Sequence, residues 1–203
     1  MLYLLSDGRQ TAFSEGRPYN HGGEQMAELT TERVTAEVEG DFVVFRIGMR
    51  INKLWKVHEW LPVLRVMPKM LEELEADAES GLLGYDTKLG IRNHEVVQYW
   101  RSFERLREYA LDSDGRHAPA IQWTNQQMRE SDAVGIWHET YLVGDGAYET
   151  VYNNTPPVGL GKAGTLYPAT ERRRTAAGRL GLTEGDDVTY KEDSVQSEPI
   201  EPQ

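Results

Sequence analysis

A histidine interrupts an otherwise apolar stretch of the chain, 134-VGIWHETYLV-143. In a β-strand, where alternate residues share a face, His138 falls in line with four other side chains: Val134, Ile136, Thr140 and Leu142. A neutral imidazole there could act as a base toward a phenol or an enol, or it could bind haem iron. The alternative is a core histidine that is bonded to a backbone carbonyl.

A second group of candidates lies where a strand is expected to give way to a helix: Arg50, Lys53, Trp55, His58 and Trp60. Such junctions open onto pockets, and the N-terminal end of a helix favours anionic groups. Arg50 or Lys53 could therefore hold a carboxylate or an enolate oxygen. His58 is the second candidate base, and the flanking tryptophans are candidate substrate-binding residues. Alternatively, the tryptophans pack as a lid and His58 is an exposed residue at the helix start.

The composition excludes several classes of protein. The chain has 203 residues, 39% of them hydrophobic, which suffices for one domain with tails. It has no cysteine, so a disulfide scaffold, a thiolate nucleophile and a cysteine-based metal site are excluded. The net charge of −11 argues against nucleic acid as a partner, and no apolar run approaches the roughly 18 residues that cross a membrane. We expect a cytoplasmic protein with neither nucleic-acid nor membrane partners.

The ratio of lysine to arginine is unusually low, with 6 lysines and 16 arginines. An acidic, lysine-poor balance is typical of proteins adapted to concentrated salt. The alternative is an ordinary acidic protein whose charge lies mostly in its tails.

The periodicity of the first half predicts a strand and then a helix. Segment 41–51 is rich in β-branched and aromatic residues, with apolar side chains on one face, and this predicts a strand. Residues 57–79 change to a helical period. Pro62 fits the first turn of that helix, whereas Pro68 should kink or interrupt it, and the helix should end before Gly81.

Five further elements are predicted: strands at 82–90 and 92–102, a helix that begins after Ser102 as its N-cap, a helix at 118–130, and a strand at 134–143 that continues into 147–154. The order βαββαβ predicts an α+β, ferredoxin-like fold, with an antiparallel sheet and helices on one face. The last strand also carries large side chains on its other face, Trp137 and Tyr141. Two sheets packed face to face would bury them, so we expect a homodimer.

The domain organisation follows from composition: a weakly ordered arm (1–31), a ferredoxin-like domain (32–155), an extension that packs on it (156–183) and an acidic tail (184–203).

Four segments together resemble a known family: 41–63, 96–110, 134–143 and 156–164. It is a family of bacterial, archaeal and fungal monooxygenase-like domains, formerly of unknown function, and the resemblance covers roughly residues 32–180. The family is grouped with the dimeric α/β-barrel proteins, which include antibiotic-biosynthesis-type monooxygenases, haem-degrading monooxygenases and haem-containing aldoxime dehydratases. The resemblance implies this fold and this neighbourhood of chemistries.

The resemblance also assigns expected roles to individual residues. The pocket of this fold lies between sheet and helices, where His138 and Thr140 would line it. Related small monooxygenases use a polar residue near the first strand to activate the substrate, which makes Asn52 a candidate. Trp100 resembles a tryptophan position of the haem-degrading relatives, although such a residue is more often part of the core.

Other patterns carry less weight. The sequence 159-GLGKAG-164 satisfies a dinucleotide-binding pattern but lacks the strand–helix context that such a site needs. The basic run 171–181 could clamp a phosphate or carboxylate, but a solvated or acid-paired segment is the stronger interpretation. His94 and His117 are expected at the surface, and His21 lies in the arm.

Three functions follow in order of preference. The first is a small oxygenase that acts on a hydrophobic or aromatic molecule without a cofactor; His138 or His58 removes a proton, and Arg50 or Asn52 stabilises the oxyanion. The second is a haem protein with His138 as the axial ligand. The third is a non-catalytic dimer that binds a small molecule.

Overall fold

The computed structural model describes residues 17–18, 32–112 and 118–186. The arm and the acidic tail lie almost entirely outside these residues, as do His21 and His117. In the part of the chain that is described, no helix is long and apolar enough to span a membrane.

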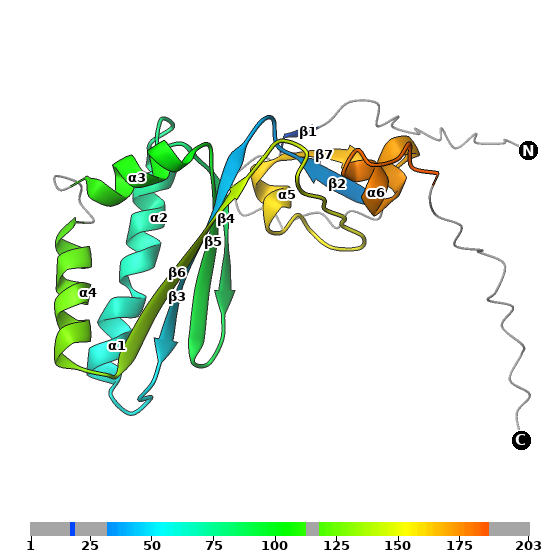
Figure 1. The fold of residues 1–203 in the computed structure, drawn as a ribbon. Coiled ribbons are helices and arrows are strands. Elements are labelled where there is room, and N and C mark those ends of the chain that lie inside the picture. The colour runs from blue at the N-terminus through cyan, green and yellow to red at the C-terminus, as the bar shows by residue number, and fades with distance from the viewer. Residues whose placement is uncertain (1–16, 19–31, 113–117, 187–203) are drawn as a thin grey trace, which may run out of the picture.

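The core of the molecule is a four-stranded antiparallel sheet in the order β4-β5-β3-β6. Its strands are β3 (Phe42–Ile51), β4 (Leu82–Leu89), β5 (Asn93–Trp100) and β6 (Val134–Val143). Four helices cover one face of this sheet: α1 (Val57–Leu64), α2 (Val66–Ala76), α3 (Phe103–Leu111) and α4 (Ala118–Glu130) (Figure 1). This strand order and the helices on a single face confirm the predicted ferredoxin-like fold.

The register of β6 decides which side of the sheet each candidate faces. His138 lies opposite Ile47 of β3, and Ile136 lies opposite Met49. These residues share the helix-covered face, as the alternation in the sequence predicted. Trp137 lies on the other face, opposite Gly48. A Cβ atom added to Gly48 would come within 2.3 Å of the Trp137 ring, so glycine is what allows the indole to lie flat on the sheet.

The predicted helix over 57–79 is two helices, and the break is at Arg65. Pro68 explains its position, because proline has no N–H to offer the Leu64 carbonyl and its ring crowds that oxygen. The interruption therefore comes one turn before the proline, and Pro68 itself lies in the first turn of α2. The second helix ends at Ala76, earlier than expected, while Gly81 (φ +80°) lies in the turn that leads to β4. Ser102 caps α3 as predicted, accepting a hydrogen bond from the Arg105 N–H.

A smaller sheet lies beyond one end of the first (Figure 1). It has the order β1-β7-β2 and consists of β1 (Arg17–Pro18), β2 (Val34–Glu37) and β7 (Thr165–Pro168). Three short helices accompany it: α5 (Leu160–Ala163), the 3₁₀ helix η1 (Glu171–Arg174) and α6 (Ala176–Arg179).

The predicted strand at 147–154 is wrong. The chain turns at Gly146 (φ +68°), and within 147–154 Tyr152 forms an isolated bridge to Val34 in place of a strand. Side chains take the place of a ladder here: the Tyr148 hydroxyl accepts from the Val38 N–H at 2.6 Å, and the Thr150 hydroxyl accepts from the Ala36 N–H at 2.8 Å.

The segment after β6 covers part of the sheet face that the helices leave open. Leu160 and Tyr148 pack against Phe42, Val97 and Tyr99 in one apolar cluster. The Lys162 ammonium is also 2.8 Å from the Asp86 carboxylate of β4. One end of the open face is therefore buried by the chain itself. Towards the other end, Trp137 and Tyr141 remain 37% and 48% exposed.

Candidate functional site

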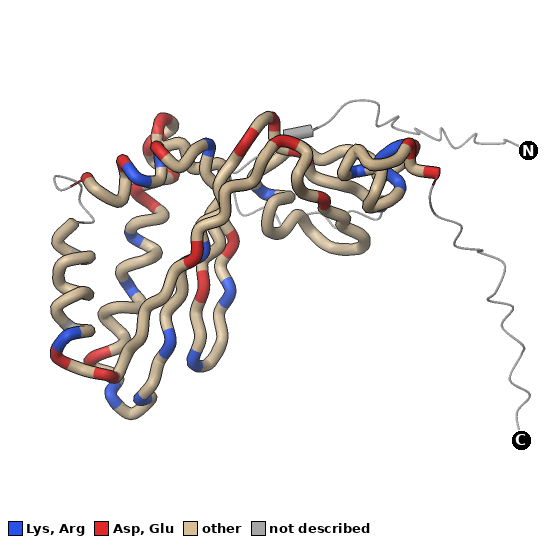
Figure 2. The backbone as a smooth tube through the Cα atoms, in the orientation of Figure 1, with Lys and Arg blue, Asp and Glu red and all other residues tan. Residues whose placement is uncertain are grey.

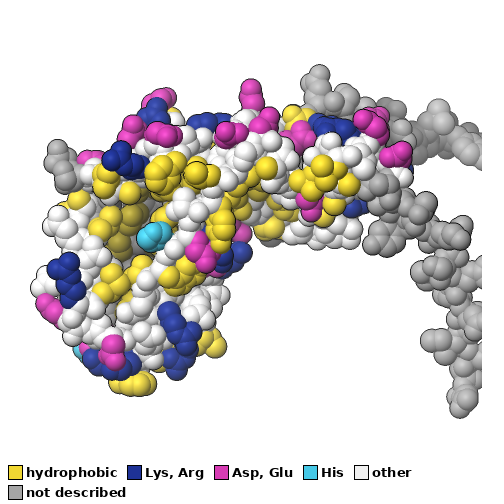
Figure 3. Space-filling model, viewed as in Figure 1, with side chains coloured by type: hydrophobic (Ala, Val, Ile, Leu, Met, Phe, Trp, Pro, Cys, Tyr) yellow, Lys and Arg dark blue, Asp and Glu magenta, His cyan; other side chains and the backbone are white. Residues whose placement is uncertain are grey.

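A cavity of about 360 Å³ lies between the helix-covered face of the sheet and the helices α1, α2 and α4. Figure 3 shows it as a hollow beside α4, rimmed by hydrophobic side chains, with a histidine at its mouth. The sheet contributes Ile47, Gly48, Met49, Thr87, Leu89, His94, Glu95, Val96, Ile136 and His138. The helices and their junction contribute Val63, Leu64, Val66, Met67, Pro68, Met70, Leu71, Ile121, Thr124, Asn125 and Met128.

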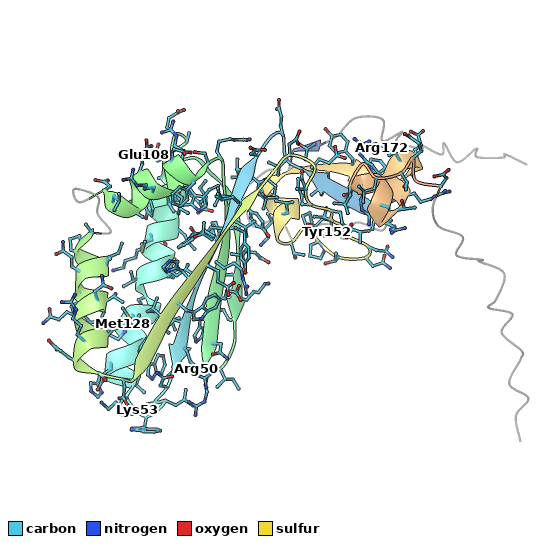
Figure 4. All side chains as sticks on the ribbon, in the orientation of Figure 1. Arg50, Lys53, Glu108, Met128, Tyr152 and Arg172 are labelled. Carbon is cyan, nitrogen blue, oxygen red and sulfur yellow. The ribbon has the colours of Figure 1, made fainter. Side chains whose placement is uncertain are left out.

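The wall of the cavity is apolar and deformable. Four of the six methionines of the chain line it: Met49, Met67, Met70 and Met128. Met128 lies on the side of α4 that faces the sheet (Figure 4). Methionine is unbranched and polarisable, so a wall of this kind adapts to an irregular apolar molecule. The volume is within the range of small-molecule sites, about 300–1,000 Å³.

His138 lies at this cavity, as expected. Its ring is 5.7 Å from the ring of Phe45, centroid to centroid, and its side chain is exposed. Among the described residues no hydrogen bond holds the imidazole, so its two nitrogens are available to a ligand or to water. The interpretation as a core histidine bonded to the backbone does not fit this position.

His94 was expected at the surface, and that expectation is wrong. It lies on the helix-covered face of β5, opposite Met49 of β3 and Leu89 of β4, and it lines the cavity. Its Nδ1 is buried without a hydrogen-bond partner in the part of the chain that is described. The turn-rich local sequence hid this residue, and the alternation of β5, which sets it in line with Val96 and Gln98, was the signal that could have found it.

The candidates at the junction of β3 and α1 lie away from the cavity. Arg50 donates to the Asn93 side chain at 3.1 Å, and Asn52 donates to the Asp132 carbonyl at 3.0 Å. Lys53 forms an ion pair with the Asp132 carboxylate. Figure 4 shows Arg50 and Lys53 toward this end of the sheet. The structure therefore brings none of these three to the cavity where an oxyanion would form.

The aromatic candidates are also separated from the cavity. The side chain of His58 is 80% exposed, and Trp55 is 73% exposed. Trp60 packs against a core cluster and donates its indole N–H to the Leu54 carbonyl at 3.0 Å. The neighbouring Glu59 carboxylate accepts from Lys56 and Ser131, which lowers its pKa.

Trp100 and Thr140 differ from His138 although they lie on the same face of the sheet. Trp100 is completely buried in the core cluster beneath α3, so the interpretation as a core tryptophan fits its position. Thr140 is exposed and lies two residues beyond His138, outside the residues that line the cavity.

Several charged side chains away from the cavity form ion pairs. On the open face of the sheet, Arg46 bridges Glu95 and Glu139 at 2.6 Å each, and the hydrogen bond with Glu95 raises the pKa of its guanidinium. In the basic run, Arg173 contacts Glu37 with two nitrogens, at 2.5 and 3.0 Å. Arg179 contacts Glu149 at 2.6 Å, so the acid-paired interpretation of the run fits these two arginines. Figure 2 shows that α4, in contrast, carries charge only near its C-terminal end.

The lining does not fit haem. Two imidazoles could bind iron, but the described residues around the cavity include no lysine or arginine to receive the two carboxylates of a haem. Burying those carboxylates without a cation would be costly. Nor do the described residues contain a cluster of histidine and acidic side chains that could hold a metal ion. The cavity therefore fits a neutral apolar molecule better than a charged cofactor.

Comparison with known proteins places the fold and the family. An aldoxime dehydratase solved with butyraldoxime superposes with a TM-score of 0.52 at 17% identity, over 74% of this chain and 44% of its own. A second aldoxime dehydratase structure gives 0.51 at 16% identity, over 80% and 49%. At this identity the likeness is one of fold.

The sequence matches extend the likeness to the family. Monooxygenase af470 of Aspergillus fumigatus is 28% identical over an alignment of 168 residues, and the match covers 76% of this chain and 54% of that protein. The chain thus spans about half the length of the relatives that it matches. The model of the Monooxygenase af470-like family matches residues 42–160, which include β3 to β6 and the whole cavity. The chain belongs to the Monooxygenase af470-like family.

Proposed function

We propose that this chain is a small oxygenase that holds a hydrophobic small molecule in the cavity between sheet and helices. The observation that carries the proposal is the position of His138, an exposed imidazole without a hydrogen bond to the described residues, at the mouth of a mostly apolar cavity. Membership of a monooxygenase-like family supports it.

His138 would act as the general base. An apolar wall disfavours ionised groups, so a phenol or enol would enter neutral and would lose its proton to the imidazole. The resulting carbanion can give two electrons to O₂ and form a C–O bond, and the terminal peroxide oxygen takes the proton back from His138 to give a hydroperoxide. Loss of water from that hydroperoxide, in which the O–O bond breaks and the same carbon gives up its hydrogen, leaves a ketone.

The other catalytic roles expected from the sequence receive no support from the positions of their side chains. Arg50, Asn52 and His58 lie outside the cavity and form other contacts. We therefore propose His138 as the base and assign no oxyanion role to these three residues.

Oxygen uptake by the full chain tests the proposal, with a panel of neutral phenols and enolisable aryl ketones such as 1-naphthol and 1-tetralone. His138→Ala is expected to lower kcat by about 10²–10⁴-fold because it removes the base, while the melting temperature changes little. His58→Ala is the matched control, since it removes an exposed histidine outside the cavity. Binding without oxygen uptake across the panel would identify a non-catalytic binding protein instead.

Haem binding is the second candidate because two imidazoles share the cavity. Titration of haemin into the full chain distinguishes it. A Soret band that forms with wild type and is lost in His138→Ala would support haem ligation and would contradict the argument from the missing cations. We expect no such band.

We also propose that the chain forms a homodimer through the uncovered part of the open sheet face. Trp137 and Tyr141 are half-exposed there, beside the ion pairs of Arg46. Light scattering is expected to give about twice the chain mass of 23.1 kDa. The chain already covers the other end of this face, so the contact between protomers would be limited to the part around Trp137. Replacing Trp137 with serine should therefore release monomers. A monomeric wild type would contradict the proposal.

A further inference from the structure

Two buried side-chain atoms lack a hydrogen-bond partner within the described residues, and both belong to the wall of the cavity. They are Nδ1 of His94 and Oγ1 of Thr124. His94 comes from β5 in the sheet wall, and Thr124 comes from α4 in the helix wall. Buried polar groups in proteins are nearly always paired, so two exceptions in one cavity point to a group that the protein itself does not supply.

The surroundings explain why neither atom is satisfied by the chain. His94 lies between Met49 and Leu89 in the register of the sheet, and neither side chain offers a strong hydrogen-bonding group. A threonine inside a helix commonly bonds the carbonyl four residues earlier, but the Thr124 hydroxyl has no partner among the described residues. Thr124 lies on the same side of α4 as Ile121 and Met128, which line the cavity with it.

The two atoms define the chemistry of a complementary ligand group. A neutral imidazole with its proton on Nε2 presents Nδ1 as an acceptor, whereas a threonine hydroxyl both donates and accepts. A ligand hydroxyl can donate to one of them and accept from the other. A purely apolar ligand would leave both unpaired, and an ionised ligand would meet no lysine or arginine in the described lining.

We propose that His94 and Thr124 bind a hydroxyl group of the ligand, and that the natural ligand is an uncharged, otherwise apolar molecule that carries a phenolic, enolic or alcoholic hydroxyl. The inference rests on the proposed function in one respect, that the cavity is the ligand site. β3 separates the strands of His94 and His138, whose partners on it are Met49 and Ile47. His94 and Thr124 thus hold one hydroxyl from β5 and α4. The proton that His138 of β6 removes belongs to a different group of the molecule, because a hydroxyl that donates to His94 or Thr124 does not donate to His138.

Calorimetric titration of the full chain with two matched probes tests this. The probes are 1-naphthol and 1-methylnaphthalene, which differ by a hydroxyl against a methyl group. Wild type is expected to bind 1-naphthol at least tenfold more tightly. Thr124→Val and His94→Leu should each reduce that preference about tenfold, while Thr124→Ser and His94→Asn, which keep a polar atom near the same place, should retain most of it.

The apo proteins provide a second readout. Thr124→Val removes a buried hydroxyl that has no partner among the described residues, so its melting temperature should stay the same or rise, which a structural role would not produce. Equal affinity for both probes, no binding of 1-naphthol, or an unchanged preference in the Val and Leu variants would overturn the inference.

Failure of the proposed function gives a different pattern, because the preference for the hydroxyl is measured without turnover. The preference without oxygen uptake would leave this inference standing and refute the oxygenase. Oxygen uptake that is lost in His138→Ala but unchanged in the His94 and Thr124 variants would support the oxygenase and refute this inference.

Discussion

Strand β5 buries polar side-chain atoms towards both ends of its helix-covered face, but only at one end are they hydrogen-bonded within the described residues. On the helix-covered face of β5, Gln98 and Trp100 lie near α3, and His94 lies at the other end. Gln98 is only 4% exposed, yet it is paired, because its carbonyl oxygen accepts from the Trp100 indole at 2.9 Å. His94 is also polar and its Nδ1 is also buried, yet that nitrogen has no partner among the described residues.

This difference indicates that the α3 end of the strand serves stability and the His94 end serves binding. At the α3 end, side chains fill the space between sheet and helix, and Gln98 and Trp100 are hydrogen-bonded to each other. At the His94 end, the space is left open, and His94 Nδ1 and Thr124 Oγ1 have no partner among the described residues. A protein tolerates such a defect where a ligand completes it. We therefore expect substitutions at the α3 end to change stability, and substitutions at the His94 end to change binding.

The largest effect is expected from Trp100→Ala. Trp100 is fully buried against Leu74 and Leu106, so truncation leaves a large void and should lower the free energy of unfolding by about 3–5 kcal/mol. Urea unfolding followed by circular dichroism measures the loss. The matched truncation at the open end, His94→Ala, should cost less than about 1 kcal/mol. Similar losses at the two sites would break the comparison.

Gln98→Met tests the paired polar group. It keeps the length of the side chain but leaves the Trp100 indole N–H buried without an acceptor, which should cost about 1–3 kcal/mol in the same urea experiment. Thr124→Val is the counterpart, since its hydroxyl has no partner to lose in the described part of the chain. A costly Thr124→Val with a neutral Gln98→Met would mean that the assignment of the two ends is reversed.

Ile136→Trp tests whether the open end serves binding. Ile136 lines the cavity, and an indole in its place should occupy the volume and weaken 1-naphthol binding at least tenfold, or about 1.4 kcal/mol. The urea midpoint should move little because the space is already there. Gln122→Trp adds the same ring on an exposed position of α4 and controls for non-specific effects. Undiminished binding in Ile136→Trp would place the ligand elsewhere.

The smallest effect is expected from the deprotonation of Tyr85 at alkaline pH, on the filled part of the helix-covered face. Burial, together with a hydrogen bond to Glu75, raises the pKa of Tyr85 from 10.0 to about 12. Since the folded pKa is the higher one, the contribution of this phenol to stability is complete below pH 10 and is lost as pH rises from 10 to 12. Wild type should therefore lose stability more steeply over this interval than Tyr85→Phe. Parallel curves in thermal melts at stepped pH would show that the phenol is not shielded in solution.

The sequence predicted the main sheet because its strands alternate along their whole length. Strand β6 needs only period-2 alternation to set His138 in line with Ile136, and the register with β3 confirms it. The helix break was predicted at the proline and found one turn earlier, since the clash of Pro68 acts on the carbonyl of Leu64. The segment 147–154 was mispredicted because side-chain hydrogen bonds from Tyr148 and Thr150 take the place of strand pairing.

What the sequence by itself determined was the order of the elements, the face of the sheet that carries His138, and the family. Those properties depend on period and local pattern, which a single segment contains. What only the tertiary structure decided was which polar residues meet. Arg50, Asn52 and His58 looked like a site because they are close in sequence, whereas His94 and Thr124 come from a strand and a helix about thirty residues apart. Whether a buried polar atom is paired depends on the packing of separate elements, and no local pattern contains that information.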